Sequence, residues 1–121
     1  MGSILLVEDD NEVAALVTEM LHELGYRITR AASAQAALGA LANDREIDVV
    51  FSDVMMPGEK NGLDLAAEVS RRRPNLKVLL TTGYAAGLIS SANKDVHVLR
   101  KPYDIRSLDR ALRAVLGDRT S

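Results

Sequence analysis

Short apolar runs rich in β-branched residues alternate along the chain with segments in which apolar residues recur at helical spacing. The runs comprise residues 4–7, 26–31, 47–52, 76–81 and 96–99. Several of them, such as residues 4–7, are apolar at consecutive positions, which is typical of strands covered by helices on both faces. We therefore predict an α/β protein with a doubly wound, open parallel sheet of five strands.

The segments between the runs predict the crossover helices. Gly25 and Gly117 each follow an apolar stripe, as is typical just after a helix C-terminus, and Ser33 is the expected N-cap of the second helix. Pro74 ends the third helix. Between residues 82 and 95 the pattern is weak, so we expect a short or irregular fourth helix there. The clear stripes cover residues 13–24, 34–41, 63–73 and 105–116.

Charged and hydroxyl side chains follow four of the five predicted strands. In an open parallel sheet the carboxyl ends of the strands meet at one edge, where ligands bind. We therefore expect these side chains to form one site. They are Glu8, Asp9, Asp10, Asp53, Thr82 and Lys101.

The residue types in this set favour phosphoryl chemistry with a metal ion. The carboxylates would repel one another at close range, and a divalent cation would remove that repulsion. The ligands on offer are oxygen atoms, which suit Mg²⁺, an ion that takes one or two carboxylates together with waters and a phosphoryl oxygen. At the end of the central strand, Asp53 is placed to act as a nucleophile toward phosphorus. The Lys101 ammonium and the Thr82 hydroxyl would bind the phosphoryl oxygens.

Composition excludes several classes of function. Of the 121 residues, 15 are Lys or Arg and 17 are Asp or Glu, so the formal net charge is −2, and no strong field for nucleic acid or anionic lipid is expected. Apolar runs of four to six residues are too short to span a bilayer. The absence of cysteine excludes disulfides, thiolate catalysis and Cys-ligated zinc. We expect one domain over residues 1–121, with its core over about 4–117, in the cytoplasm.

The segments at the strand ends, taken together and in order, resemble the motifs of the receiver domain of two-component response regulators. The resemblance covers nearly the whole chain, over residues 4–116. It is greatest to receivers fused to hybrid sensor histidine kinases, and next to single-domain response regulators. The matching segments are Leu5-Leu6-Val7-Glu8-Asp9-Asp10, Asp53-Val54-Met55-Met56-Pro57-Gly58, Thr82-Gly83 and Lys101-Pro102.

The resemblance implies a flavodoxin-like fold with strand order 2-1-3-4-5 and a role for each matched residue. It implies that Asp53 is the phosphoacceptor, that Thr82 and Lys101 bind the phosphoryl group, and that the peptide between Lys101 and Pro102 is cis. Asp10 falls outside the matched acidic pair, and we expect it to cap a helix. The implied ligands of Mg²⁺, for which Mn²⁺ could substitute, are Glu8, Asp9, Asp53 and the backbone carbonyl of Met55.

The resemblance also implies partners. A histidine kinase or a histidine phosphotransfer domain would donate the phosphoryl group, and a downstream protein or fused domain would be regulated. The chain would promote only its own phosphorylation and dephosphorylation, so it is not expected to be an enzyme acting on other substrates. Direct nucleic-acid binding and membrane insertion are not expected.

Two features depart from the family pattern. Val98 stands three residues before the lysine, where many receivers have an aromatic residue that responds to phosphorylation. The usual aromatic relay is therefore not expected at that position, and Tyr84 and Tyr103 are the candidate substitutes. The loop over residues 57–62 is longer by one residue than the commonest form.

Three other functions share part of the pattern. A flavin or nucleotide binder would need a phosphate cradle after the first strand, where Glu8 and Asp9 would repel phosphate. A phosphohydrolase with an Asp nucleophile usually has a second carboxylate two residues later, where this chain has Met55. A receiver-like interaction module that is never phosphorylated is disfavoured by the intact set of phosphoacceptor residues.

Overall fold

A computed structural model of the chain describes residues 2–44, 46–55, 61–83 and 96–117. The short helix expected after the fourth strand falls in residues 84–95 and so lies outside the described residues. No helix in the described ranges is both long and apolar enough to cross a membrane. The elements in chain order are β1 (Ser3–Val7), α1 (Asn11–Glu23), β2 (Arg27–Ala31), α2 (Ala34–Asn43), β3 (Val49–Asp53), α3 (Gly62–Arg72), β4 (Lys77–Thr82), β5 (Val96–Arg100) and α4 (Ile105–Leu116).

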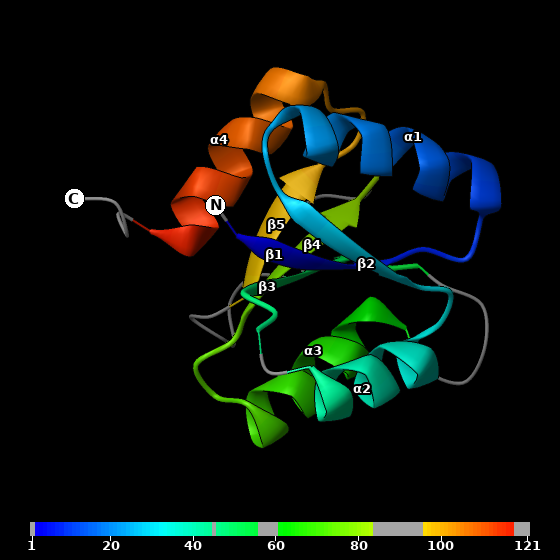
Figure 1. Ribbon diagram of the computed structural model, residues 1–121, viewed down its shortest axis with the longest axis vertical. Coiled ribbons are helices and arrows are strands. Elements are labelled where there is room, and N and C mark those ends of the chain that lie inside the picture. Colours follow the sequence, from blue (N-terminus) through cyan, green and yellow to red (C-terminus); the bar gives the residue numbers. More distant parts are fainter. Residues whose placement is uncertain (1, 45, 56–60, 84–95, 118–121) are drawn as a thin grey trace.

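The strands form one parallel sheet in the order β2-β1-β3-β4-β5, which confirms the predicted doubly wound topology (Figure 1). The order reverses between β1 and β3, the place in such sheets where a crevice for ligands opens at the carboxyl ends of the strands. The register sets Asp53 beside Thr81 of β4, and Thr82 beside Arg100 of β5. The end of β3 therefore lies close to the strand ends that carry Thr82 and Lys101.

Alternate residues of the strands point into two separate cores, one on each face of the sheet. Leu5 and Val50 pack with α2 and α3, while Leu6 and Phe51 pack with α1 and α4 on the other face (Figure 1). These four side chains are at most 3% exposed. Burial on both faces explains why the inner strands β1, β3 and β4 read as continuous apolar runs, since a strand with one wet face would alternate apolar and polar residues.

The second strand begins one residue later than its apolar run suggests. The pattern predicts Tyr26 as a strand residue, but its backbone N–H donates to the Leu21 carbonyl at 3.1 Å and so closes the end of α1. Gly25, just before it, has a φ of 96°, the left-handed conformation that glycine adopts readily and that the sequence predicts at this helix end. β2 therefore starts at Arg27.

Candidate phosphoacceptor site

The carboxylate of Asp53 lies at the carboxyl end of β3, the middle strand of the sheet. The four residues before it in β3 are buried, whereas its own side chain is 18% exposed. Its Oδ1 accepts a hydrogen bond from the backbone N–H of Met55 at 3.1 Å, and its Oδ2 lies 2.5 Å from Nζ of Lys101. A backbone donor and a cation thus hold the two carboxylate oxygens of Asp53.

The end of β5 brings Lys101 to Asp53. The backbone N–H of Lys101 donates to the carbonyl of Thr82 at 2.8 Å, which extends the contact between β4 and β5 by one residue. The peptide between Lys101 and Pro102 is cis, as the resemblance implies. The Lys101 side chain is 42% exposed, so water reaches one side of the ion pair and the pair contributes modestly to stability.

Thr82 is the last residue of β4 and is only 1% exposed. Because β4 lies between β3 and β5, Thr82 reaches the same edge of the sheet as Asp53 and Lys101. The structure therefore brings together, at one edge, the three residues that the sequence analysis assigns to the phosphoryl group.

The loop after β1 carries Glu8, Asp9 and Asp10, and we call these three residues the acidic loop. The backbone N–H of Glu8 donates to the carbonyl of Ala31 at 2.9 Å, so the loop leaves β1 alongside β2. The Glu8 carboxylate accepts a hydrogen bond from the backbone N–H of Asp10 at 3.0 Å. Asp10 Oδ1 accepts from two backbone N–H groups in the first turn of α1, at 2.8 and 3.1 Å, which confirms its role as the N-cap.

The carboxyl group of Glu8 interacts electrostatically with the carboxylates of Asp9 and Asp53. Burial raises the pKa of Glu8 above its ordinary value, and the carboxylates of Asp9 and Asp53 raise it further, while the hydrogen bond from the Asp10 backbone lowers it. Burial is thus the largest cause of the raised pKa, and the neighbouring like charges add to it; a bound divalent cation would act in the opposite direction. The acidic loop and Asp53 therefore lie within electrostatic reach of one another.

The donors at this edge fit Mg²⁺ by their chemistry. Among the described residues, no three Asp, Glu or His side chains are grouped closely enough to hold a metal ion by themselves. Mg²⁺ does not require such a group, because it combines one or two carboxylates with carbonyl and water oxygens. The oxygens available are those of Glu8, Asp9 and Asp53 and the backbone carbonyl of Met55, a residue that is 60% exposed.

Tyr103 is an aromatic residue beside the site, whereas Tyr84 lies outside the described residues. The Tyr103 ring packs edge-on against Phe51, with 6.2 Å between ring centroids and 61° between ring planes. Tyr103 also lines, with Glu8 and Asp53, a hollow of only about 10 Å³. No local sequence pattern predicts the packing of Tyr103 on Phe51, because the fold brings these two distant segments together.

The phenol of Tyr103 should titrate well above an ordinary tyrosine. Burial raises the pKa of Tyr103 to about 12, and the charges of Glu8 and Asp53 add to the shift. Since an unfolded tyrosine ionises near pH 10, the stability that depends on neutral Tyr103 is fully present below pH 10 and is lost as the pH rises toward 12. Absorbance titration of tyrosinate should show one tyrosine that ionises near pH 12 in the native protein, and this tyrosine should be missing from the titration of Tyr103→Phe. If the tyrosine lost in Tyr103→Phe is instead one that ionises near pH 10, the prediction is wrong.

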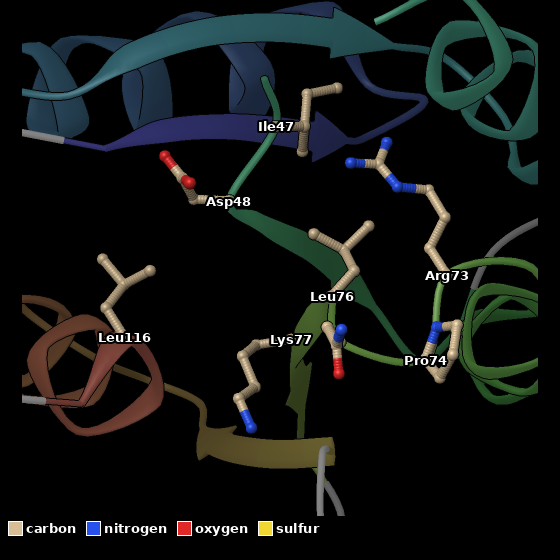
Figure 2. Close-up of a pocket in the computed structure, with 8 residues that line it drawn as sticks. Ile47, Asp48, Arg73, Pro74, Leu76, Lys77 and Leu116 are labelled. Carbon is tan, nitrogen blue, oxygen red and sulfur yellow. The ribbon is translucent and has the colours of Figure 1, made fainter. Parts of the chain in front are cut away.

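A larger cavity, of about 530 Å³, lies at the opposite edge of the sheet. Figure 2 shows its lining, to which Asp48 and Lys77 contribute from the amino ends of β3 and β4, Arg73 from the end of α3, and Leu116 from α4. None of the candidate site residues lines this cavity. The residues expected to carry out phosphoryl chemistry therefore lie at the carboxyl edge of the sheet and not in the larger cavity.

Comparison with known proteins agrees with this geometry. The family model of the response regulator receiver domain matches residues 4–113. The response regulator receiver protein CpdR of Brucella abortus is 32% identical over 119 residues, which cover 96% of this chain and 98% of that protein. The sensor kinase CckA of the same organism is 31% identical over 119 residues, 95% of this chain but only 12% of the kinase.

A solved structure supports the same assignment. The response regulator protein TrrA of Thermotoga maritima, in complex with Mg²⁺-BeF, is 30% identical and superposes with a TM-score of 0.78, covering 95% of this chain and 99% of that one. The five-stranded parallel sheet, in the order β2-β1-β3-β4-β5, is consistent with this likeness. The chain belongs to the response regulator receiver domain family.

Proposed function

We propose that Asp53 accepts a phosphoryl group from a phosphohistidine donor and that the phosphorylated chain regulates a partner protein or a fused domain. The observation that carries the proposal is the Asp53 carboxylate at the end of β3, held 2.5 Å from the Lys101 ammonium and within electrostatic reach of Glu8. A nucleophilic carboxylate beside a cation is suited to phosphoryl transfer, which depends mainly on positioning and on neutralising charge.

In the transfer, one oxygen of the Asp53 carboxylate forms a bond to phosphorus while the bond from phosphorus to the donor imidazole nitrogen breaks. The bonding electron pair leaves with that nitrogen, which then takes a proton. The Lys101 ammonium moves from the Asp53 carboxylate to a phosphoryl oxygen, and the Thr82 hydroxyl donates to another. The backbone N–H of Met55 keeps the carboxylate oriented.

Mg²⁺ would be held by Glu8, Asp9, Asp53 and the Met55 carbonyl, and it would neutralise charge on the phosphoryl oxygens; Mn²⁺ could take its place. The relative from T. maritima is complexed with Mg²⁺ and a beryllium fluoride. That likeness supports the same ion at the acidic edge of this chain.

A change in conformational population would transmit the signal. Val98 pairs with Leu80 across β4 and β5, and it supplies no aromatic ring to follow a movement of Thr82. Among the described residues, Tyr103, which packs on Phe51 beside the site, is the aromatic residue that could take this part. We infer that the partner surface responds through this pair, which is fixed to β3 itself. The partners would be a histidine kinase or phosphotransfer domain upstream and a protein or fused domain downstream.

Chemical mapping of the phosphorylated residue tests the proposed function. The protein is incubated with acetyl phosphate and Mg²⁺, and the intact mass should increase by one phosphoryl group. Borohydride, which reduces acyl phosphates, should then convert Asp53 alone to homoserine, as read by peptide mass mapping. Chelation of the metal before the reaction should prevent the mass increase. An unmodified protein, or a label on another carboxylate, would refute the assignment and favour an interaction module that works without phosphorylation.

A further inference from the structure

Arg30, near the end of the edge strand β2, binds the backbone of the acidic loop. Its Nε and Nη2 both donate to the carbonyl oxygen of Glu8, at 3.0 and 2.7 Å. Its Nη1 donates to Oδ1 of Asn11, the first residue of α1, at 2.8 Å. One guanidinium group therefore connects β2 to both ends of the loop that carries the expected metal ligands.

With this contact, both backbone polar groups of Glu8 are hydrogen-bonded to residues of β2. The backbone N–H of Glu8 already donates to Ala31, the neighbour of Arg30, at 2.9 Å. The N–H and the carbonyl of Glu8 are thus both held by β2, on either side of the Glu8 side chain. The carbonyl of Glu8 belongs to the same peptide plane as the nitrogen of Asp9, and so its orientation constrains where the Asp9 side chain starts.

The geometry requires a guanidinium group. Two donors in a planar fork converge on one carbonyl oxygen while a third nitrogen reaches a second acceptor, an arrangement that a lysine ammonium on its flexible stem cannot reproduce. Hydrogen bonds from a charged donor are also stronger than neutral ones. Loss of the fork would leave the Glu8 carbonyl without these two bonds even if the positive charge were kept.

The charge and the hydrogen bonds of Arg30 act on a bound cation with opposite signs. A positive charge near the acidic loop repels a divalent cation, so removal of that charge alone would tighten metal binding. Loss of the hydrogen bonds loosens the ligands and weakens binding, as is found for groups that orient metal ligands from outside. A variant that keeps the charge but loses the hydrogen bonds therefore distinguishes the two effects.

We propose that Arg30 is a positioning residue that fixes the acidic loop for divalent-cation binding through its bonds to the Glu8 carbonyl and Asn11. This inference rests on the proposed function, because it takes Glu8 and Asp9 as ligands of the cation. Arg30 does not touch the metal or the phosphoryl group in this role. It holds the loop in the shape that binding needs, before the ion arrives.

Mn²⁺ binding, measured by the loss of the free-ion electron paramagnetic resonance signal, tests the inference without any phosphorylation. Arg30→Lys keeps the charge, and Arg30→Met removes it. We expect Arg30→Lys, which loses the fork but keeps the charge, to bind Mn²⁺ about tenfold more weakly than the native protein. In Arg30→Met the loss of the charge offsets part of that effect, so this variant should bind Mn²⁺ more tightly than Arg30→Lys. An unchanged affinity in Arg30→Lys would show that only the charge matters and would overturn the inference.

Arg27 supplies the matched control on the same strand. It lies at the start of β2, where its side chain is 80% exposed and 3.8 Å from a Glu46 carboxylate oxygen, away from the acidic loop. Arg27→Lys and Arg27→Met should leave the Mn²⁺ affinity unchanged. If they weaken it as much as the Arg30 variants do, the effect belongs to β2 in general and the role of Arg30 is refuted.

Phosphorylation by acetyl phosphate gives a second readout. In Arg30→Lys the Mg²⁺ concentration for half-maximal rate should rise by about the same factor as the Mn²⁺ dissociation constant, while the rate at saturating Mg²⁺ should stay near the native value. A lower rate at saturation with an unchanged Mg²⁺ requirement would overturn the inference. If the native protein takes up no phosphoryl group, the proposed function fails, and the Mn²⁺ comparison still decides whether Arg30 positions the loop.

Discussion

Asp53→Asn is expected to take up no phosphoryl group from acetyl phosphate or from a histidine donor, at any Mg²⁺ concentration. An amide has neither the negative charge nor the nucleophilic oxygen that forms the acyl phosphate. The fold should persist, because Asp53 is the last residue of β3 and its side chain is not part of either core. The Asn oxygen can still accept from the backbone N–H of Met55, as Oδ1 of Asp53 does at 3.1 Å.

The variant should also relieve a repulsion. The Asp53 charge is one of the causes that raise the pKa of Glu8, so that pKa should fall in Asp53→Asn, as read by carboxyl NMR titration in the absence of metal. Asp48→Asn is the matched control. Asp48 precedes the same strand at its other end, where its Oδ2 accepts from the backbone N–H of Ser3 at 2.9 Å. The Asp48→Asn variant should take up a phosphoryl group to the same extent as the native protein. Phosphoryl uptake by Asp53→Asn would remove Asp53 from the mechanism.

The sheet could be predicted from the sequence because its cause is local. A strand such as β3 is buried on both faces, and this condition leaves a continuous apolar run that is visible in the sequence. Once such runs and the more mixed segments of the outer strands alternate with helical stripes, the parallel topology places the residues after each strand at one edge. Asp53, Thr82 and Lys101 were therefore predictable as neighbours from the sequence alone.

The contacts that orient the site could not be predicted in this way. Arg30 lies 22 residues from Glu8 in the chain, and an exposed arginine in a strand gives no sign of the carbonyl it will bind. The packing of Tyr103 on Phe51 likewise joins two distant segments. Such contacts depend on the register of β1 with β2 and on how α4 follows β5, and these are settled by the whole fold rather than by any local pattern.

Gly62→Ala is expected to destabilise the protein and to displace Asp53, because α3 begins in direct contact with the end of β3. A Cβ atom at Gly62 would lie 2.4 Å from the carbonyl oxygen of Asp53 and 2.8 Å from Cα of Val54. Both are backbone atoms and cannot turn aside as a flexible side chain would. The backbone N–H of Gly62 also donates to the Val54 carbonyl at 2.8 Å, so the helix cannot retreat without breaking that bond.

The cost should be about 1–3 kcal/mol in the free energy of unfolding, as for other insertions into tightly packed places, measured by urea denaturation followed by circular dichroism. Phosphorylation of the folded variant should also slow, since the atom nearest the new methyl group belongs to Asp53 itself. Gly39→Ala is the matched control with the opposite sign. Gly39 lies within α2, and a Cβ atom there would meet nothing within 4 Å, so alanine should stabilise the helix by about 0.5–1 kcal/mol. Equal stability of Gly62→Ala and the native protein would show that α3 and the end of β3 can separate freely, and the rigid placement of Asp53 by this contact would then have to be abandoned.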